Sequence, residues 1–483
     1  MKTTIPEGAR APTILEATIS LVALIIGITT SILIYGLDPH IPMVLGVIVA
    51  SIVGLRCGFS WTNIQNGMVR GITNAIPAVI ILLVVGMLIG IWILAGVVPT
   101  LIYYGLLILS PAIFLPATLL ICAVISLATG TSWGTTGTIG VALMGVGAGL
   151  GIPLPLVAGA VLSGAYFGDK ISPLSDTTNM APAMAGTDLF THIRHMSYTT
   201  GVSFAITLVI ESVLSFRYAA AEGNVERVET MLATLDANYT INPVLFVAPL
   251  VVLVVSIKKI PAIPGITVGA VVGAIFAAGL QGASWPDILN SAMYGVSSET
   301  GGNDVDNLLS RGGMDSMTYT ISLTMIALMF GGVMERTNQL KVLADAILAR
   351  AQSSGSLITA TALTGVGSNL VLCDQYMSIV MTGRTYAEAY RDRGLAPENL
   401  SRAVEDSATV TANLVPWNSG GAYQAATLGV ATIAYMPFAF FCWLSPIVTI
   451  LFGVFGITIK PLNEEEREKS EALSRATIRD VAG

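Results

Sequence analysis

Long apolar runs recur along the entire chain, and they constrain its fold more than any other feature. Residues 14–35, 76–98 and 198–214 each contain at most one charged side chain. A helix of about 20 apolar residues crosses the hydrocarbon core of a bilayer, which is about 30 Å thick. One such run could be a signal peptide, but a whole series of them cannot be. The sequence therefore predicts an all-α integral membrane protein in contact with the lipid bilayer.

The composition agrees with this fold class and excludes several functions. Of the 483 residues, 53% are hydrophobic and 11% are charged, whereas a soluble domain carries about 25% charged residues. The net charge of −7 comes without a basic patch interleaved with aromatics, so we expect no nucleic-acid partner. The four cysteines lack paired spacing, and no catalytic or nucleotide motif occurs. We therefore expect a protein that is not an enzyme and needs no cofactor.

A faint internal repeat runs through the chain at a shift of about 243 residues. Its matched pairs share an order, which carries more weight than any single match. They are Gly90 with Gly332, Gly151 with Gly394, Ala160 and Val161 with Ala403 and Val404, and Pro173 with Pro416. Earlier in each half the shift is smaller: Trp61 corresponds to Trp285, 224 positions later. The repeat predicts two halves of similar architecture.

Charge placement predicts that the second half is inverted. Arg56 and Arg70 flank the second loop of the first half, but Lys258 and Lys259 follow the first segment of the second half. Cytoplasmic loops concentrate Lys and Arg, and an inverted repeat requires an odd number of crossings per half. We expect five in each half, about 10 transmembrane helices in total, with both termini cytoplasmic. The expected crossings are 14–36, 41–56, 72–98, 156–183 and 196–217, then 243–257, 262–280, 314–335, 400–420 and 428–456.

This count divides the chain into four parts and leaves one apolar piece per half unassigned. The parts are the first inverted repeat (residues 1–217), an external linker (218–242), the second inverted repeat (243–460) and a charged cytoplasmic tail (461–483). Between Arg350 and Arg384 there is too little chain for two crossings and a turn. We therefore expect a re-entrant hairpin there with its tip near residues 367–375, and a partner at 112–150 with its tip at 130–138. Such backbone survives at membrane depth only when it is buried in protein or lines a cavity.

The strongest local signal is the polar stretch GDKISPLSDTTN, residues 168–179. Pro173 should break a helix here, because proline lacks the backbone N–H and clashes with the preceding turn. Broken helices expose carbonyl oxygens at membrane depth, where secondary transporters bind ions, and carboxylates and hydroxyls are hard ligands that suit Na⁺. The alternative is a polar cytoplasmic loop in which Asp169, Lys170 and Asp176 are merely solvated. Intramembrane carboxylates nevertheless suggest function, because burying them is expensive.

The corresponding stretch of the second half is SRAVEDSATVTANLVPWNSGG, residues 401–421, which should break at Pro416. Glu405 and Asp406 lie one turn from Arg402, so a structural salt bridge and an ion site both remain open for them. At the hairpin tips, hydroxyls among glycines fit either ion contact or helix packing. Asp374 is the one carboxylate of the second hairpin, which favours a role in coupling.

These two motifs resemble the NhaC-type sodium/proton antiporter family of the ion-transporter superfamily. The resemblance implies a secondary carrier of the bacterial cytoplasmic (inner) membrane, with paired re-entrant hairpins and broken helices. Superfamily members often work as dimers by an elevator-like displacement, so a homodimer is an expectation. By the same resemblance, one half of the site combines the tip at Thr131 and Ser132 with the break at Ser175, Asp176, Thr177, Thr178 and Asn179. The other half combines the tip at Ser368, Asn369 and Asp374 with the break around Asn413 and Asn418.

We interpret the chain as a carrier that exchanges Na⁺ for H⁺ by alternating access, with these two ions as its coupling ions. A carboxylate that takes either a proton or Na⁺ couples the two flows by competition. The favoured residues are Asp176 and Asp374, then Asp169 and Asp406, with Na⁺ near Asp176, Ser175, Ser132 and Asp374. The alternative is exchange of an organic anion of the malate or lactate type, or of an amino acid. Because Arg384 to Arg402 fall in an expected cytoplasmic loop, the sequence favours the simple cation exchange.

Overall fold

The computed structural model describes residues 5–219 and 224–462, and within these ranges every regular element is helical apart from one isolated bridge between Leu395 and Pro461. Seven of the described helices are long and apolar enough to cross a membrane, or up to nine if each bent pair forms one span. The predicted all-α membrane fold is confirmed at this level. The count of ten crossings in two inverted repeats stays a prediction.

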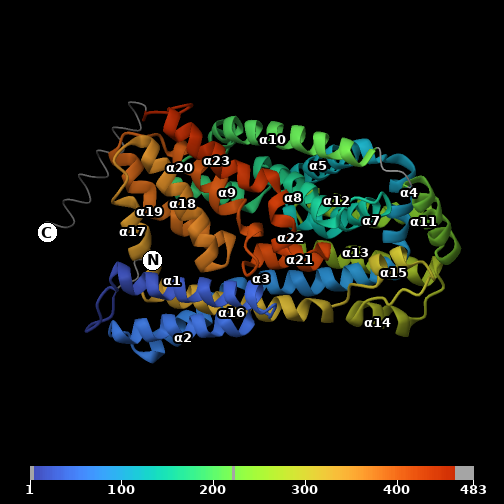
Figure 1. Cartoon of the computed structure of the whole chain (residues 1–483), viewed down its shortest axis with the longest axis horizontal. Helices are drawn as coiled ribbons and strands as arrows, with labels where there is room; N and C mark the ends of the chain where they lie inside the picture. The colour runs from blue at the N-terminus through green and yellow to red at the C-terminus, as the bar shows by residue number, and fades with distance from the viewer. Residues whose placement is uncertain (1–4, 220–223, 463–483) are drawn as a thin grey trace.

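The helices are arranged in two layers along the long axis of the molecule (Figure 1). The layer at the bottom of Figure 1 contains α1, α2, α3, α14 and α16, and α13 packs on α3. Their bounds are α1 Ile14–Thr29, with the π-helical turn η1 Thr30–Ile34, α2 His40–Arg56, α3 Trp61–Leu94, α13 Ala262–Leu280, α14 Trp285–Tyr294 and α16 Thr318–Arg336.

Glycines let α3 and α16 approach closely within this layer. A Cβ added at Gly71 would lie 2.2 Å from the carbonyl oxygen of Leu328, and one added at Gly332 would lie 2.1 Å from that of Gly67. Contacts this short leave no room for a side chain. Small residues commonly permit such backbone approach between membrane helices, where close packing replaces the hydrophobic effect.

The upper layer holds both expected hairpins and both expected helix breaks. Its main helices are α5 Pro111–Thr129, α8 Leu154–Ile171, α9 Asp176–Ala185, α10 Leu189–Ala219, α18 Ser354–Leu372, α19 Gln375–Asp392, α20 Pro397–Val404, α21 Ser419–Leu428 and α23 Phe440–Phe455. Further helices and helical turns complete the hairpins and breaks: α6 Ser132–Thr135, η2 Thr136–Gly140, α7 Val141–Gly149, η5 Glu405–Thr409, η6 Ala412–Leu414, α22 Thr432–Tyr435 and η7 Met436–Phe438. The two layers therefore differ in kind, since the breaks are confined to the upper one.

The remaining helices connect the layers or close the ends of the molecule. They are α4 Val97–Ile108, α11 Asn224–Asn238, η3 Pro243–Phe246, α12 Val247–Ile257, α15 Asn303–Leu309, η4 Asp315–Met317 and α17 Gln339–Leu348. At the left of Figure 1, α1 begins and α23 ends, so both lie at the same end of the molecule. The opposite end carries α4, α11 and α15.

The bounds of the helices repeat the internal match found in the sequence. Gly130 and Cys373, whose numbers differ by 243, both end a helix with positive φ, at 70° and 57°. The next residues, Thr131 and Asp374, both cap the following helix with their side chains. The same shift relates α9, which runs from its N-cap Ser175 to Gly186, to α21, which runs from Asn418 to Gly429. The repeated local geometry supports two related halves.

Several expected boundaries differ from the structure. The crossing expected at 72–98 begins at Trp61, because α3 continues for 34 residues without interruption. The crossing expected at 428–456 is bent by 57° between Phe438 and Phe440. The linker 218–242 contains α11, and nearly all of the expected tail lies outside the described residues, which end at 462. Since α5 and α18 each have 19 residues and could cross a membrane by length, re-entrant hairpins also stay a prediction.

Candidate functional site

The first break interrupts the helix where Pro173 predicts it, between the end of α8 at Ile171 and the start of α9 at Asp176. The hydroxyl of Thr178 turns back and donates to the carbonyl oxygens of Asp169 and Lys170, at 3.2 and 2.9 Å. These carbonyls lack the partners that a continuous helix would provide. The break is therefore a closed local structure that holds the last turn of α8 at a fixed position.

The first hairpin tip binds this last turn through Asp169. Both the backbone N–H and the hydroxyl of Ser132 donate to Oδ2 of Asp169, at 3.0 and 2.6 Å. A Cβ at Gly130, which has φ of +70°, would lie 2.6 Å from the Cβ of Leu174, so tip and break pack directly together. Asp169 is 6% exposed, and its Oδ1 has no hydrogen-bond partner among the described residues. One carboxylate oxygen is thus held in place while the other remains available to a ligand.

The second half forms a similar pair in which the acid and the hydroxyl have changed places. Asp374 at the hairpin tip caps α19 by accepting from the N–H of Met377 at 2.9 Å. Its other oxygen accepts from the hydroxyl of Ser419, the first residue of α21 after the break, at 3.3 Å. In the first half the acid is on the broken helix, and in the second it is on the tip. Each half therefore contributes one buried carboxylate joined to a serine.

Acidic side chains of both halves interact electrostatically with Tyr376 in α19. Its hydroxyl lies within electrostatic range of three carboxylates, Asp169, Asp176 and Asp374, and the residue keeps 37% exposure. Asp176 itself is exposed at the start of α9, whereas Asp169 and Asp374 are buried. Of the two carboxylates that the sequence favoured most, Asp176 is thus accessible and Asp374 is buried.

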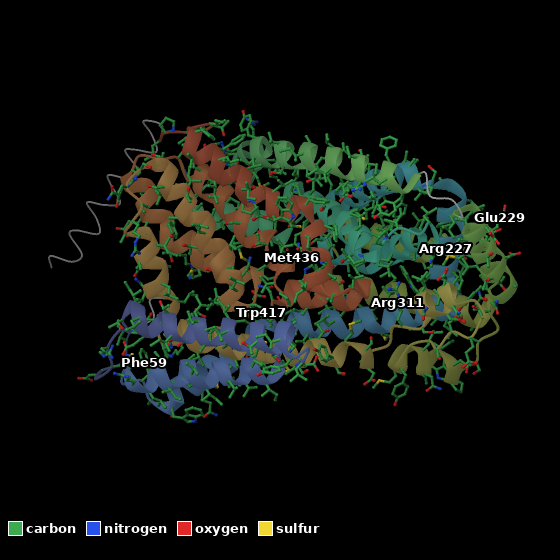
Figure 2. All side chains as sticks on the ribbon, in the orientation of Figure 1. Phe59, Arg227, Glu229, Arg311, Trp417 and Met436 are labelled. Carbon is green, nitrogen blue, oxygen red and sulfur yellow. The ribbon has the colours of Figure 1, made fainter. Side chains whose placement is uncertain are left out.

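Aromatic rings add a second contact between the halves. The indole of Trp133 at the first tip stacks on the ring of Tyr423 in α21, with centroids 4.2 Å apart. The Tyr423 hydroxyl donates to the carbonyl oxygen of Trp133 at 2.7 Å. Trp417 lies where the two layers of helices face each other (Figure 2), and its indole N–H donates to the Leu370 carbonyl at 2.9 Å. None of these contacts could be predicted from the sequence, because each joins residues that lie far apart along the chain.

A buried ion pair ties the first break to the second. The ammonium of Lys170 contacts Oδ1 of Asp406 and donates to the Ser445 hydroxyl at 2.8 Å. Asp406 also accepts from the hydroxyls of Thr199, at 2.7 Å, and Thr449. Lys170 and Asp406 are both 0% exposed, so the view of Lys170 as a solvated loop residue was wrong. Asp406 is held by a complete set of partners, which suits a structural role better than ligand binding.

Arg402 was expected to pair with Glu405 or Asp406, or to lie in a cytoplasmic loop, and it does neither. It lies within α20 at 0% exposure and donates to the Thr458 hydroxyl at 2.7 Å. The helix α20 begins at Pro397, three residues before the expected crossing at 400–420, so Arg402 lies in a helix rather than in a loop. Glu405 is left fully buried, with no hydrogen-bond partner for either oxygen among the described residues.

The other expected site residues support the backbone of the tips and breaks. In the first half, the hydroxyls of Ser175 and Thr177 lie 3.1 Å apart, Asn179 donates to the carbonyls of Pro173 and Ser175, and Thr131 caps α6. In the second half, Asn369 donates to the Ala408 carbonyl, Asn418 to the Asn369 carbonyl, and Asn413 to the Val410 carbonyl. Ser368 is helical and buried near Met381. The expected second tip is shorter than predicted, because α18 continues to Leu372.

The donor set suits an alkali cation. Among the described residues no group of three or more His, Cys, Asp or Glu side chains could hold a metal ion. The convergent groups are carboxylates and hydroxyls, hard oxygen donors without a soft or imidazole ligand. The arrangement can therefore offer a few oxygens and a negative charge to a small hard cation.

Comparison of the sequence with known proteins places this chain in a family. Residues 164–457 match the sequence profile described as the Na⁺/H⁺ antiporter family. The Na⁺/H⁺ antiporter NhaC of Alkalihalophilus pseudofirmus is 42% identical over 92% of this chain and 97% of its own length. This chain belongs to the Na⁺/H⁺ antiporter family. The family resemblance carried by the two broken-helix motifs is thus confirmed.

Other relatives of this family member carry names with different solutes. The malate-2H⁺/Na⁺-lactate antiporter of Bacillus subtilis is 39% identical over 94% of this chain and 96% of its own length. The arginine/ornithine antiporter ArcD of Halobacterium salinarum is 35% identical over 97% of this chain and 98% of its own length. All three relatives are named as antiporters rather than enzymes, and two of the three names include an organic solute.

Proposed function

We propose that this chain exchanges Na⁺ for H⁺ across the cytoplasmic membrane by alternating access, with both ions using the site between the two breaks. Asp169 and Ser132 form one side of this site, and Asp374 and Ser419 form the other. The observation that carries the proposal is that each half joins a buried carboxylate to a serine hydroxyl, at 2.6 Å for Asp169 and 3.3 Å for Asp374. The stacked rings of Trp133 and Tyr423 and the Lys170–Asp406 ion pair join the two halves around them.

Coupling follows from the chemistry of a carboxylate away from bulk water. Asp169 is buried and offers its Oδ1 without a hydrogen-bond partner among the described residues. Burial disfavours the bare anion, and either a proton or a nearby cation removes the penalty. Because Na⁺ and a proton each neutralise the same excess of negative charge in this site, Na⁺ entering the site expels a proton. The exposed Asp176 stands where a hydrated ion would first meet the site.

The proposed mechanism assigns different tasks to the two layers. The upper layer carries the tips, the breaks and the buried ion pair, whereas α3 and α16 in the lower layer cross through glycines. A rigid frame and a moving binding layer would suit elevator-like displacement in a homodimer. The repeated helix bounds support two related halves. In the proposed mechanism these halves are inverted repeats with re-entrant hairpins, cytoplasmic termini and an external linker at 218–242.

Reconstituted protein in proteoliposomes tests this function. With a pH-sensitive dye inside, an inward Na⁺ gradient should drive proton efflux for the wild type. Asp169→Asn should abolish this flux, and Asp176→Asn should raise the Na⁺ concentration needed for half-maximal rate. Asp345→Asn is the matched control, because Asp345 pairs with Lys341 on the surface of α17, away from the site. Full exchange by Asp169→Asn would remove this residue from the mechanism.

A second candidate function is exchange of an organic anion or an amino acid coupled to Na⁺ and H⁺. It is favoured by the names of the malate/lactate and arginine/ornithine relatives. Counterflow of labelled malate, lactate, arginine and ornithine into preloaded proteoliposomes distinguishes the two. We expect no counterflow with any of these solutes. Accumulation of one of them, dependent on Na⁺ or pH, would replace cation exchange by solute exchange.

A further inference from the structure

Glu405 differs from the other acidic residues of the hairpin tips and broken helices. Glu405 is 0% exposed, and neither carboxylate oxygen has a hydrogen-bond partner among the described residues. Among the described residues of the upper layer it shares this lack of hydrogen-bond partners with Glu211, which lies on the unbroken helix α10. Asp169, Asp374 and Asp406 each accept at least one hydrogen bond. An ionised carboxylate in such surroundings is costly unless it is neutralised. The surroundings of Glu405 therefore require a proton or a cation for at least part of the transport cycle.

The local backbone places Glu405 at an irregularity of the second broken helix. Glu405 begins η5, a π-helical turn that follows α20 without interruption. Turns of this kind are rare and are often found at functional sites, because they redirect side chains within a helix. The corresponding position of the first half, Leu162, lies in the regular helix α8. The two halves differ here by an acid on one side and an apolar residue on the other.

The groups around Glu405 connect it to the proposed Na⁺ site. Thr177 of α9 and Thr409 of η5 present hydroxyls to its carboxyl group, and Asp169 and Lys170 act on it electrostatically. The hydroxyl of Thr409 also lacks a hydrogen-bond partner among the described residues. The ammonium of Lys170 is paired with Asp406, and among the described residues no salt bridge joins it to Glu405. Glu405 thus has hydroxyl neighbours and a second carboxylate, but no counter-ion of its own.

Few other charges reach this region. The helices α18 and α23, which pack on η5, contain no Asp, Glu, Lys, Arg or His. The one charged residue of α9 is Asp176. On α10, His192 contacts the Ser401 hydroxyl at 2.7 Å and interacts electrostatically with Asp406 and Lys170. Arg402, on the same helix as Glu405, donates to Thr458. α19 also packs on η5, and its Arg384 is exposed.

We propose that Glu405 binds the transported proton while Asp169 binds Na⁺, and this proposal rests on the Na⁺/H⁺ exchange proposed above. Na⁺ at Asp169 adds a positive charge near Glu405, which favours its ionised form and releases the proton. A proton on Glu405 in turn lowers the negative charge that attracts Na⁺. Such a coupling is reciprocal by linkage. In this arrangement Asp169 binds Na⁺ and Glu405 binds the proton, so the two ions do not have to occupy the same carboxylate.

The test compares Na⁺ binding and Na⁺/H⁺ exchange in the wild type, Glu405→Gln and Glu398→Gln. Glu398 lies on the same helix, is nearly buried and pairs with Lys460 near the surface, so it controls for loss of a buried acid in α20. In the wild type, direct ²²Na⁺ binding should weaken as pH falls, approaching tenfold in Kd per pH unit when one proton competes. Glu405→Gln should still bind ²²Na⁺, with this pH dependence lost, and should catalyse Na⁺/Na⁺ but not Na⁺/H⁺ exchange. Glu398→Gln should behave like the wild type.

The outcomes separate this inference from the proposed function. If the wild type shows no Na⁺-driven proton flux, the exchange function fails and the role of Glu405 fails with it. If the wild type exchanges Na⁺ for H⁺ and Glu405→Gln does so equally well, only the role of Glu405 is overturned. If Glu405→Gln does not fold, the wild type still decides by carbodiimide labelling, which modifies protonated buried carboxyls. Labelling of Glu405 that Na⁺ suppresses supports the proposal, and absence of labelling at Glu405 overturns it.

Discussion

The ion pair between Lys170 and Asp406 gives the sharpest quantitative prediction of this structure. Both side chains are 0% exposed, and Asp406 also accepts from the hydroxyls of Thr199 and Thr449. Lys170→Met leaves the Asp406 carboxylate buried without its counter-ion. Breaking a buried pair from one side costs about 3–5 kcal/mol, because the remaining charge keeps its desolvation penalty. We expect a loss of this size in the free energy of unfolding.

The complete experiment is a double-mutant cycle with Lys170→Met, Asp406→Asn and the combined variant. The double variant removes both charges, so it should be destabilised no more than either single variant, with a coupling energy of about 3–5 kcal/mol. Unfolding in mixed detergent micelles, followed by tryptophan fluorescence, provides the free energies. The surface pair Lys341 and Asp345 is the control and should show a coupling energy of about 0.5 kcal/mol or less. Additive losses in Lys170→Met and Asp406→Asn would refute the assignment of a coupled buried pair.

Three further predictions follow from local contacts. Ser132→Ala removes one of the two hydrogen bonds to Asp169. Na⁺ binding to the purified protein should therefore weaken by about 1.5 kcal/mol, roughly tenfold in Kd. Unchanged binding would show that the hairpin tip does not contribute to the Na⁺ site. Gly71→Leu forces a side chain into the contact between α3 and α16 and should lower the melting temperature. Gly279→Leu places the same side chain in open space on α13 and should leave the melting temperature unchanged. An equal loss of melting temperature in both variants would contradict the close approach of α3 and α16. Asp306 lies outside the spans, and the backbone N–H and hydroxyl of Thr300 hold its pKa below the usual value. The stability that the ionised Asp306 gives to its loop is therefore present at neutral pH. It is lost as pH falls through the lowered pKa. Hydrogen exchange of the loop, corrected for intrinsic rates, should therefore rise on acidification in the wild type but not in Asp306→Asn.

The sequence determined the class of the protein and the position of its irregular segments. The length of its apolar runs requires membrane-spanning helices, because they match the thickness of the hydrocarbon core. Pro173 and Pro416 lie in the gaps between α8 and α9 and between η6 and α21, since proline acts on the turn that contains it. The shift of 243 residues reappears in the helix ends at Gly130 and Cys373. These features depend on local or regularly repeated information, which one sequence displays.

Only the tertiary structure decided which polar side chains meet. Lys170 and Asp406 are separated by 236 positions along the chain, and no spacing rule pairs them. The same holds for Trp133 with Tyr423, and for Tyr376 with the carboxylates of both halves. The sequence ranked Asp176 above Asp169, but the packing of the first tip buries Asp169 and leaves Asp176 exposed. Whether a polar group is solvated, paired or left for a ligand depends on its neighbours across the fold, and those neighbours are set by how the two broken helices pack.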